Sequence, residues 1–310
     1  MEPQIMNEKK PTVGVIGLGN AGLALAQPLS RRFDVLGYDR DTGRLALARD
    51  MGLRGAADAA QLARESGIIL LSLPTPAASL AAADALAQGA PDDALRDRLI
   101  VETSTVSPQD VAALQARVAG HGARVVDAAI IGGVHKLAEG KTTFLVGADP
   151  ADYARARPVL EAAAEEIFHL GAAGSGMRAK LVSNAVAHTT MVMLLEAAAL
   201  AVKAGVPLDV FYTLMRRESG LMRPLTHRFG ERILGQDFEG GMPTANARKD
   251  SALALELARE LGVPLFTMQA SHSVYEIARG AGLDRLDYAS ISKLWEQWMD
   301  IGFGKDAHAH

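Results

Sequence analysis

The sequence predicts an α/β protein in which a doubly wound parallel sheet is followed by an all-helical region. Short apolar runs alternate with alanine-rich segments of helical spacing through the first half of the chain. A glycine-rich loop directly follows the first apolar run, and strand signals end after Gly174. Because 310 residues suffice for two domains, we expect them at residues 1–172 and 173–310.

The expected strands are short apolar runs bounded by turns, as is typical of buried parallel strands. They lie at 12–16, 34–38, 68–73, 98–101, 123–130, 142–147 and 165–169. Helical segments separate the first of them, near 20–31, 42–50, 58–65, 76–88 and 108–119. Ser107-Pro108 predicts a helix start, because the hydroxyl caps free amides and Pro108 has no amide to satisfy. Asp149-Pro150 predicts another helix start.

The segment from Gly174 to about Lys203 is apolar on nearly every helical face. Such a helix must be buried, so we expect it between domains or between subunits of a dimer or tetramer. Gly205-Val206-Pro207 ends it. Further helices are expected near 208–217, 222–234, 244–261, 264–280 and 287–301.

The composition excludes several classes of protein. The 32 basic residues are scattered and the net charge is −4, which argues against nucleic-acid binding. The chain has no cysteine, hence neither disulfides nor thiolate chemistry, and its eight histidines lack metal-ligand spacing. The first eleven residues are polar, and no run reaches about 18 uninterrupted apolar residues. We expect a cytoplasmic protein without metal or membrane.

A dinucleotide site is predicted at the loop between the first strand and the first helix. Its residues are Gly17, Leu18, Gly19, Asn20, Ala21 and Gly22. This Gly-x-Gly-x-x-Gly pattern is weak alone, but strand 12–16 and the helix after it supply the context of a Rossmann fold. The helix N-terminus would offer free amides to the pyrophosphate.

Asp39 follows the second strand, 22 residues after Gly17, where a carboxylate can accept hydrogen bonds from both adenosine ribose hydroxyls. It would repel the additional phosphate of NADP. The neighbouring Arg40 would attract that phosphate or cover the adenine. Because the carboxylate stands at the deciding position, we expect NAD, with NADP as the alternative.

Lys180 and Asn184 lie four residues apart, on one face of the long apolar helix. Burial of an amine lowers its pKa toward the range useful for proton transfer. A solvated or ion-paired lysine at a helix start is the alternative interpretation.

Four segments resemble the β-hydroxyacid dehydrogenases, the family of 3-hydroxyisobutyrate dehydrogenase and tartronate semialdehyde reductase. They are GLGNAGLALAQPL at 17–29, DAAIIGGVHKLAEGKTTFLVG at 127–147, the Gly174-x-Gly176-x-x-x-Lys180-x-x-x-Asn184 pattern, and ARKDSALALELA at 247–258. All four occur in the family's order and at its usual spacing.

The resemblance implies roles for individual residues. Lys180 would be the catalytic acid/base and Asn184 would orient the reacting oxygen, while backbone amides of Gly132 and Gly133 would hold the substrate carboxylate. Further contacts would be made by Lys249 at the nicotinamide end, by Thr105 with Ser104 near the nicotinamide ribose, and by the Leu73-Pro74 turn over the cofactor. Capping explains the hydroxyls of Ser104 and Thr105 equally well.

The chain departs from the family pattern before the double glycine, where Ala129 and Ile131 replace Pro and Ser. A substrate-binding hydroxyl is thereby lost, so the substrate is expected to differ around Ile131. His188, one turn beyond Asn184, is a candidate donor in its place, or a structural core histidine. His135 and Lys136 after the double glycine, and a basic stretch around Arg216, Arg217, Arg223, His227 and Arg228, are candidate anion contacts or plain solvated surface. Trp295 and Trp298 are expected to pack against a partner or the core.

These features favour an NAD(P)-dependent dehydrogenase that moves hydride between nicotinamide and a small 3-hydroxyacid, or reduces a semialdehyde. An imine reductase shares the fold and loop but generally carries another residue at the position of Lys180. A non-catalytic dinucleotide-binding scaffold is the remaining alternative, and the pair Lys180 and Asn184 argues against it.

Overall fold

A computed structural model describes residues 10–88, 94–217 and 221–308 and divides into two compact units, residues 1–185 and 186–310. The division falls inside α8 (Ser175–Lys203), a helix that runs from one unit into the other. The domain boundary predicted at residues 172/173 stays a prediction. The polar N-terminus on which we based the absence of a signal peptide lies almost entirely outside the described residues.

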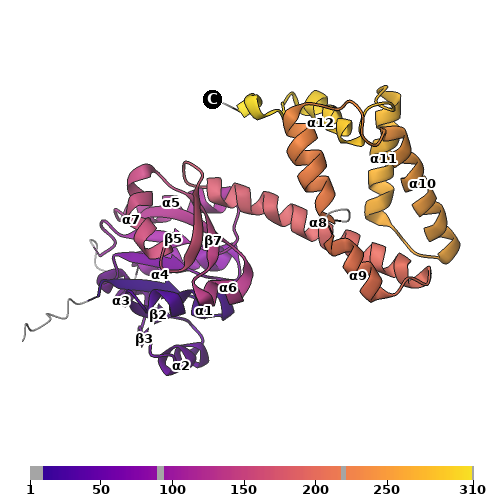
Figure 1. Ribbon diagram of the computed structural model, residues 1–310. Helices are drawn as coiled ribbons and strands as arrows, with labels where there is room; N and C mark the ends of the chain where they lie inside the picture. The colour runs from indigo at the N-terminus through magenta and orange to yellow at the C-terminus, as the bar shows by residue number, and fades with distance from the viewer. Residues whose placement is uncertain (1–9, 89–93, 218–220, 309–310) are drawn as a thin grey trace, which may run out of the picture. The chain divides into compact units, whose positions relative to one another are not determined.

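The first unit contains an eight-stranded sheet in the order β3-β2-β1-β4-β5-β6-β7-β8 (Figure 1). Its strands are β1 (Thr12–Ile16), β2 (Asp34–Tyr38), β3 (Arg54–Gly55), β4 (Ile68–Leu71), β5 (Leu99–Glu102), β6 (Arg124–Ile131), β7 (Thr142–Gly147) and β8 (Ala164–His169). Its other helices are α1 (Asn20–Leu29), α2 (Thr42–Asp50), α3 (Ala59–Glu65), α4 (Pro76–Gln88), α5 (Pro108–Ala119), α6 (Gly133–Glu139) and α7 (Pro150–Leu160).

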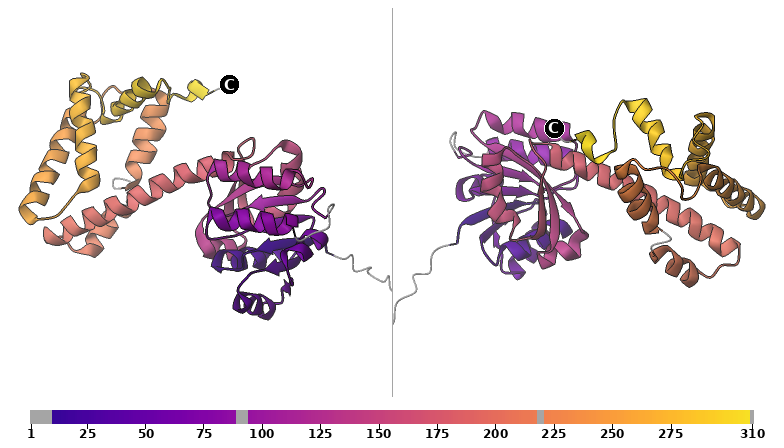
Figure 2. Two further views of the ribbon diagram at one scale, coloured as in Figure 1. Left: turned by 180° about the vertical axis from the view of Figure 1, so that it is seen from behind. Right: turned by 45° about the horizontal axis from the view of Figure 1, so that its top comes forward.

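Helices cover both faces of this sheet because successive strand residues point to opposite sides (Figure 2). In β4, Leu70 packs into a core with α1, α2, α6 and α7. Its neighbours Ile69 and Leu71 pack into a second core with α3, α4 and α5. The doubly wound architecture is confirmed.

The sheet departs from the prediction at its far edge. β7 pairs antiparallel with β6 and parallel with β8, so the sheet is mixed. Residues 132–141, which join β6 to β7, are fewer than the dozen or more that a parallel crossover needs. Two elements were missed, the short helix α6 and the two-residue strand β3.

The predicted helix starts at Pro108 and Pro150 are confirmed. The Ser107 hydroxyl accepts the Asp110 backbone N–H at 3.1 Å, and the Asp110 carboxylate accepts that of Ser107 at 2.8 Å. This reciprocal capping box fixes the start of α5. Asp149 makes no capping bond and instead pairs with Arg124 at 2.5 Å.

The second unit is helical, as predicted. Besides the end of α8 it contains α9 (Leu208–Arg216), a π-helix (Pro224–Ile233), α10 (Thr244–Leu261), α11 (Phe266–Gly280), a 3-10 helix (Tyr288–Ile291), α12 (Ser292–Met299) and a 3-10 helix (Lys305–His308). α10 and α11 pack side by side, as Figures 1 and 2 both show. The predicted helix at 222–234 is a π-helix, and the one predicted at 287–301 is a 3-10 turn followed by α12.

The α8 helix is exposed in the single chain, where Val182, Val186 and Leu195 are 68%, 65% and 58% exposed. It is long and apolar enough to cross a membrane by length and mean hydropathy, although polar residues interrupt it. Only 6% of its most apolar 18-residue window is buried. The apolar composition of α8 predicts a buried helix, and this burial is not found within a single chain.

Candidate active site

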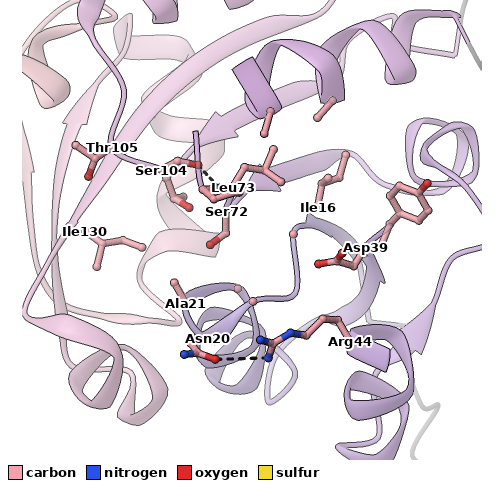
Figure 3. Close-up of a pocket in the computed structure, with 18 of the residues that line it drawn as sticks. Ile16, Asn20, Ala21, Asp39, Arg44, Ser72, Leu73, Ser104, Thr105 and Ile130 are labelled. Atoms are coloured by element: carbon pink, nitrogen blue, oxygen red, sulfur yellow. Dashed lines mark hydrogen bonds between the residues drawn. The ribbon is translucent and has the colours of Figure 1, made fainter. Parts of the chain in front are cut away.

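A cavity of about 850 Å³ opens at the carboxyl ends of β1, β2, β4 and β5, within the first unit. The strand order reverses between β1 and β4, and ligands of such sheets bind at this switch point. In Figure 3, Asp39 and Arg44 lie at one end of the cavity, and Thr105 and Ile130 lie at the other. A volume of this size suits a cofactor or small-molecule ligand.

The glycine loop forms the floor of this cavity, and its shape fits a dinucleotide. Gly17 has a φ of +90°, a conformation open to glycine, and the next residues lead into α1. A Cβ added at Gly22 would collide with the Gly17 carbonyl oxygen, whereas a Cβ at Gly19 would meet nothing within 4 Å. The missing side chain of Gly22 therefore lets the start of α1 pack closely against the Gly17 carbonyl. The missing side chain of Gly19 leaves open space where the pyrophosphate would approach the backbone.

This difference predicts opposite outcomes for two alanine substitutions. We expect Gly19→Ala to keep the wild-type melting temperature but to weaken NADH binding at least about tenfold, because its methyl group occupies the phosphate space. Gly22→Ala should weaken binding and also lower stability by about 1–3 kcal/mol, because the added methyl overpacks the loop. NADH fluorescence titration and thermal unfolding measure the two effects. Equal destabilisation by both variants would contradict the assignment.

Asp39 is held in place by the backbone around it. Its Oδ2 accepts the Leu18 N–H at 2.7 Å and its Oδ1 accepts the Asp41 N–H at 2.9 Å. The Leu18 side chain is fully buried, so Leu18 contributes its backbone rather than lining the cavity. Each oxygen of Asp39 retains a second acceptor position for a ribose hydroxyl.

Two arginines stand beside Asp39 in the cavity wall. Arg40 is exposed, and Arg44 on α2 donates to the Asn20 side-chain oxygen at 3.5 Å (Figure 3). Arg44 was not predicted from the sequence, although its position in the first turn of the helix after Asp39 could have indicated it. The adenosine end thus combines one fixed carboxylate with two cations.

The predicted nicotinamide end contains Leu73, Pro74, Ser104 and Thr105. The Ser104 hydroxyl accepts the Leu73 N–H at 2.8 Å. This bond connects the loop after β5, which contains Ser104, to the loop after β4, which contains Leu73. Thr105 is exposed and lines the cavity without a hydrogen bond to the described residues. The Ser104 hydroxyl thus links two loops and caps no helix, and the contacts of Ser104 and Thr105 with the nicotinamide ribose stay predictions.

Lys180 reaches this end of the cavity from the first turns of α8. Its Nζ donates to the Ile130 carbonyl oxygen at 2.8 Å, and Gly132 and Gly133 line the same wall. Burial lowers the pKa of the Lys180 ammonium below the ordinary lysine value. No carboxylate pairs with it among the ion pairs of the described residues, so the salt-bridged alternative is not observed.

The start of α8 is fixed by Asp127, which the sequence analysis did not single out. Asp127 is fully buried in β6, and its two oxygens accept the N–H groups of Gly174 at 2.5 Å and Met177 at 2.7 Å. These amides are free at a helix start, and a carboxylate there also meets the positive end of the helix dipole. A charged residue inside the apolar run VVDAAI was the signal available in the sequence.

Several predicted residues lie outside the cavity wall. Ile131 is half-buried, and its neighbour Ile130 lines the wall instead. Asn184 is half-buried one turn beyond Lys180, and His188 is exposed in the second unit. Lys249, also in the second unit, is exposed and pairs with Asp250 at 3.1 Å. The roles of these four residues stay predictions.

Other candidates are surface residues in the described chain. His135 and Lys136 are exposed on α6. Trp295 and Trp298 pack on each other with ring centroids 5.3 Å apart and remain 40% and 46% exposed. No three His, Asp or Glu side chains converge as a metal site among the described residues, and the predicted absence of a metal stays a prediction.

The sheet, the glycine loop and the fixed carboxylate define a dinucleotide-binding oxidoreductase fold. Residues 12–171 match the family model for the NAD binding domain of 6-phosphogluconate dehydrogenase. Residues 174–295 match the model for the NAD-binding domain of NADP-dependent 3-hydroxyisobutyrate dehydrogenase. The chain belongs to the β-hydroxyacid dehydrogenase family and binds NAD(P).

Relatives of known activity cover nearly the whole chain. The chain is 30% identical over 305 residues to 2-(hydroxymethyl)glutarate dehydrogenase of Eubacterium barkeri, covering 95% of this chain and 98% of that one. It is 26% identical to the structure of 3-hydroxyisobutyrate dehydrogenase of Mycobacterium tuberculosis with L-serine, with a TM-score of 0.61 and coverage of 92% and 99%. An imine reductase from Pseudomonas sp. shares the fold, with a TM-score of 0.82, 24% identity and coverage of 93% and 100%.

Proposed function

We propose that this protein is an NAD(P)-dependent dehydrogenase that oxidises the hydroxyl of a small 3-hydroxyacid, or reduces the corresponding semialdehyde, with Lys180 as the acid/base. The observation that carries the proposal is the Lys180 ammonium in the wall of the dinucleotide cavity, 2.8 Å from the Ile130 carbonyl oxygen and beside Gly132 and Gly133. This position joins a proton-transferring group to the expected nicotinamide end of the site.

Each part of the site has a task in this reaction. A nicotinamide bound in this cavity would accept hydride from the carbinol carbon of the hydroxyacid, or donate it to the carbonyl carbon of the semialdehyde. The Lys180 amine takes the hydroxyl proton during oxidation and returns it during reduction. Backbone amides at Gly132 and Gly133 would hold the substrate carboxylate without a countercharge, and Asn184 would orient the reacting oxygen.

A substrate panel tests the reaction class. The purified protein is mixed with NAD or NADP and with 3-hydroxyisobutyrate, 2-(hydroxymethyl)glutarate, threonate and glycerate, and absorbance at 340 nm is followed. A cyclic imine with NADPH tests the imine reductase alternative in the same assay. An increase at 340 nm with a hydroxyacid supports the proposal, and turnover of the imine alone would overturn it.

The cofactor preference follows from Asp39, and we expect NAD to be used better than NADP. The Asp39 carboxylate would repel a 2′-phosphate at the ribose. Asp39→Asn keeps one acceptor for the backbone and removes the charge, while Arg40 and Arg44 remain to attract the phosphate. The ratio of kcat/KM for NADP to that for NAD should rise about tenfold or more, equivalent to about 1.4 kcal/mol. Asp50→Asn on the exposed end of α2 is the charge-matched control and should leave the ratio unchanged.

The exposed apolar surface of α8 supports a homo-oligomer as the working form. Val182, Val186 and Leu195 would be covered by a second copy of the chain, because large exposed apolar patches mark interaction surfaces. The acidic residue of this helix, Glu196, accepts the backbone N–H groups of Phe266 and Thr267 within the helical unit. Light scattering without detergent should give at least twice the mass of one chain. A monomer would contradict this part of the proposal, and binding to lipid vesicles would contradict the predicted absence of a membrane partner.

A further inference from the structure

A second cavity, of about 810 Å³, lies within the helical unit and shares no lining residue with the dinucleotide cavity. Its wall contains four basic side chains, those of Arg223, His227, Arg228 and Arg232. The π-helix explains why these residues meet. Its hydrogen bonds join residues five apart, which is the spacing of His227 and Arg232, and the N-cap residue Arg223 precedes Arg228 by the same five residues. Such helices are rare and occur frequently at functional sites.

Arg228 is the unusual member of this group. Its side chain stacks on the Tyr288 ring, with the guanidinium carbon 4.8 Å from the ring centroid, and the residue is only 9% exposed. Its buried Nε has no hydrogen-bond partner among the described residues. A guanidinium has five N–H donors, and buried donors without acceptors are costly.

The nearest carboxylate, that of Asp287, faces the Nε of Arg228. Arg228 Nε lies 3.2 Å from Asp287 Oδ1, and this oxygen also accepts the Ala289 N–H at 2.9 Å. The other oxygen accepts the Met242 N–H at 3.1 Å. Asp287 is fully buried and balances the charge of Arg228 on its Nε side, while the two terminal nitrogens of the guanidinium make no hydrogen bond to the described residues.

The rest of the wall is fixed around Arg228. Arg232 donates to the Glu239 carbonyl oxygen at 2.7 Å and to that of Asp237 at 3.3 Å. His227 lies 2.6 Å from the Glu231 carboxylate. Glu231 is one of the two exposed acidic residues of the wall, and His227 is its partner. Arg223 is exposed and has no ion pair with the described residues, so its charge is available at the mouth of the cavity.

We propose that this cavity binds a compact oxyanion, a carboxylate or a phosphate, on the forked guanidinium of Arg228, with Arg223 as the second cation. A planar guanidinium binds two oxygens of such a group at once, and this geometry would supply acceptors for the terminal nitrogens of Arg228. The ligand is either a dicarboxylic acid or inorganic phosphate.

Calorimetric titration of the full-length protein tests the site independently of any dehydrogenase activity. Glutarate and inorganic phosphate are titrated separately, at ionic strength matched with chloride. Arg228→Lys keeps the charge beside Asp287 but loses the fork, and it should weaken binding about tenfold or more. Arg223→Gln should weaken binding several-fold, at an unchanged melting temperature. Arg217→Gln removes an exposed arginine outside the cavity and is the matched control.

Saturable binding that Arg228→Lys and Arg223→Gln weaken, and Arg217→Gln does not, supports the proposal. Glutarate binding alone identifies a carboxylate ligand, and phosphate binding alone identifies a phosphate ligand. The proposal is overturned if neither anion binds, or if the Arg217 variant loses binding equally. Because the readout is binding, a negative result leaves the proposed dehydrogenase activity intact.

Discussion

Replacing Lys180 with alanine should lower kcat by roughly 10²–10⁴, the usual contribution of a positioned general acid/base. The variant should still bind NADH, because the glycine loop and Asp39 are distant in sequence from Lys180 and belong to other elements of the cavity. Steady-state rates on the substrate identified by the panel and NADH fluorescence titration measure the two effects. Lys141→Ala, at an exposed lysine paired with Glu139, is the control. Undiminished turnover in Lys180→Ala would remove the lysine from the mechanism.

The pH dependence of the wild-type enzyme should report the same group. Oxidation needs the neutral amine of Lys180, so its rate rises with pH and levels off above the pKa of this residue. Because burial lowers that pKa, the plateau should begin below the ordinary lysine value of about 10.4. Reduction needs the ammonium and should fall over the same pH interval. A rate of oxidation that is independent of pH would argue for another base.

The fold was largely predictable because each strand and helix of the sheet carries its own local signal. β4 is a short apolar run between turns, and α5 begins with a capping box and proline that depend on adjacent residues alone. The antiparallel pairing of β7 depends on the length of a connection instead, which periodicity does not encode. The π-helix and the exposure of α8 likewise depend on long-range packing.

The site was predictable where function is tied to a backbone motif. Gly17, Gly19 and Asp39 lie at their expected positions in the cavity, and Lys180 reaches its wall. Asp127 and Arg44 were missed because their roles arise from contacts between distant elements.

Asp127 should also matter for turnover, although it is a positioning residue. Its two oxygens each accept one N–H of the start of α8, and Lys180 follows Met177 by three residues on that helix. Asn in its place offers one acceptor and sets an NH₂ group against the second N–H donor. We expect Asp127→Asn to lower the free energy of unfolding by about 2 kcal/mol and kcat by at least about tenfold.

A structural role alone would lower stability without changing the chemistry, so the control must separate the two. Asp152 is another buried carboxylate of the first unit, on α7, and pairs with Arg124 at 2.8 Å. Asp152→Asn should destabilise the protein without lowering kcat, because α7 carries no residue of the cavity wall. In Asp127→Asn the pH at which oxidation levels off should also shift, since the burial that lowers the Lys180 pKa depends on the placement of α8. An unchanged pH profile and kcat in that variant, measured at a temperature where it is folded, would show that Asp127 serves the fold alone.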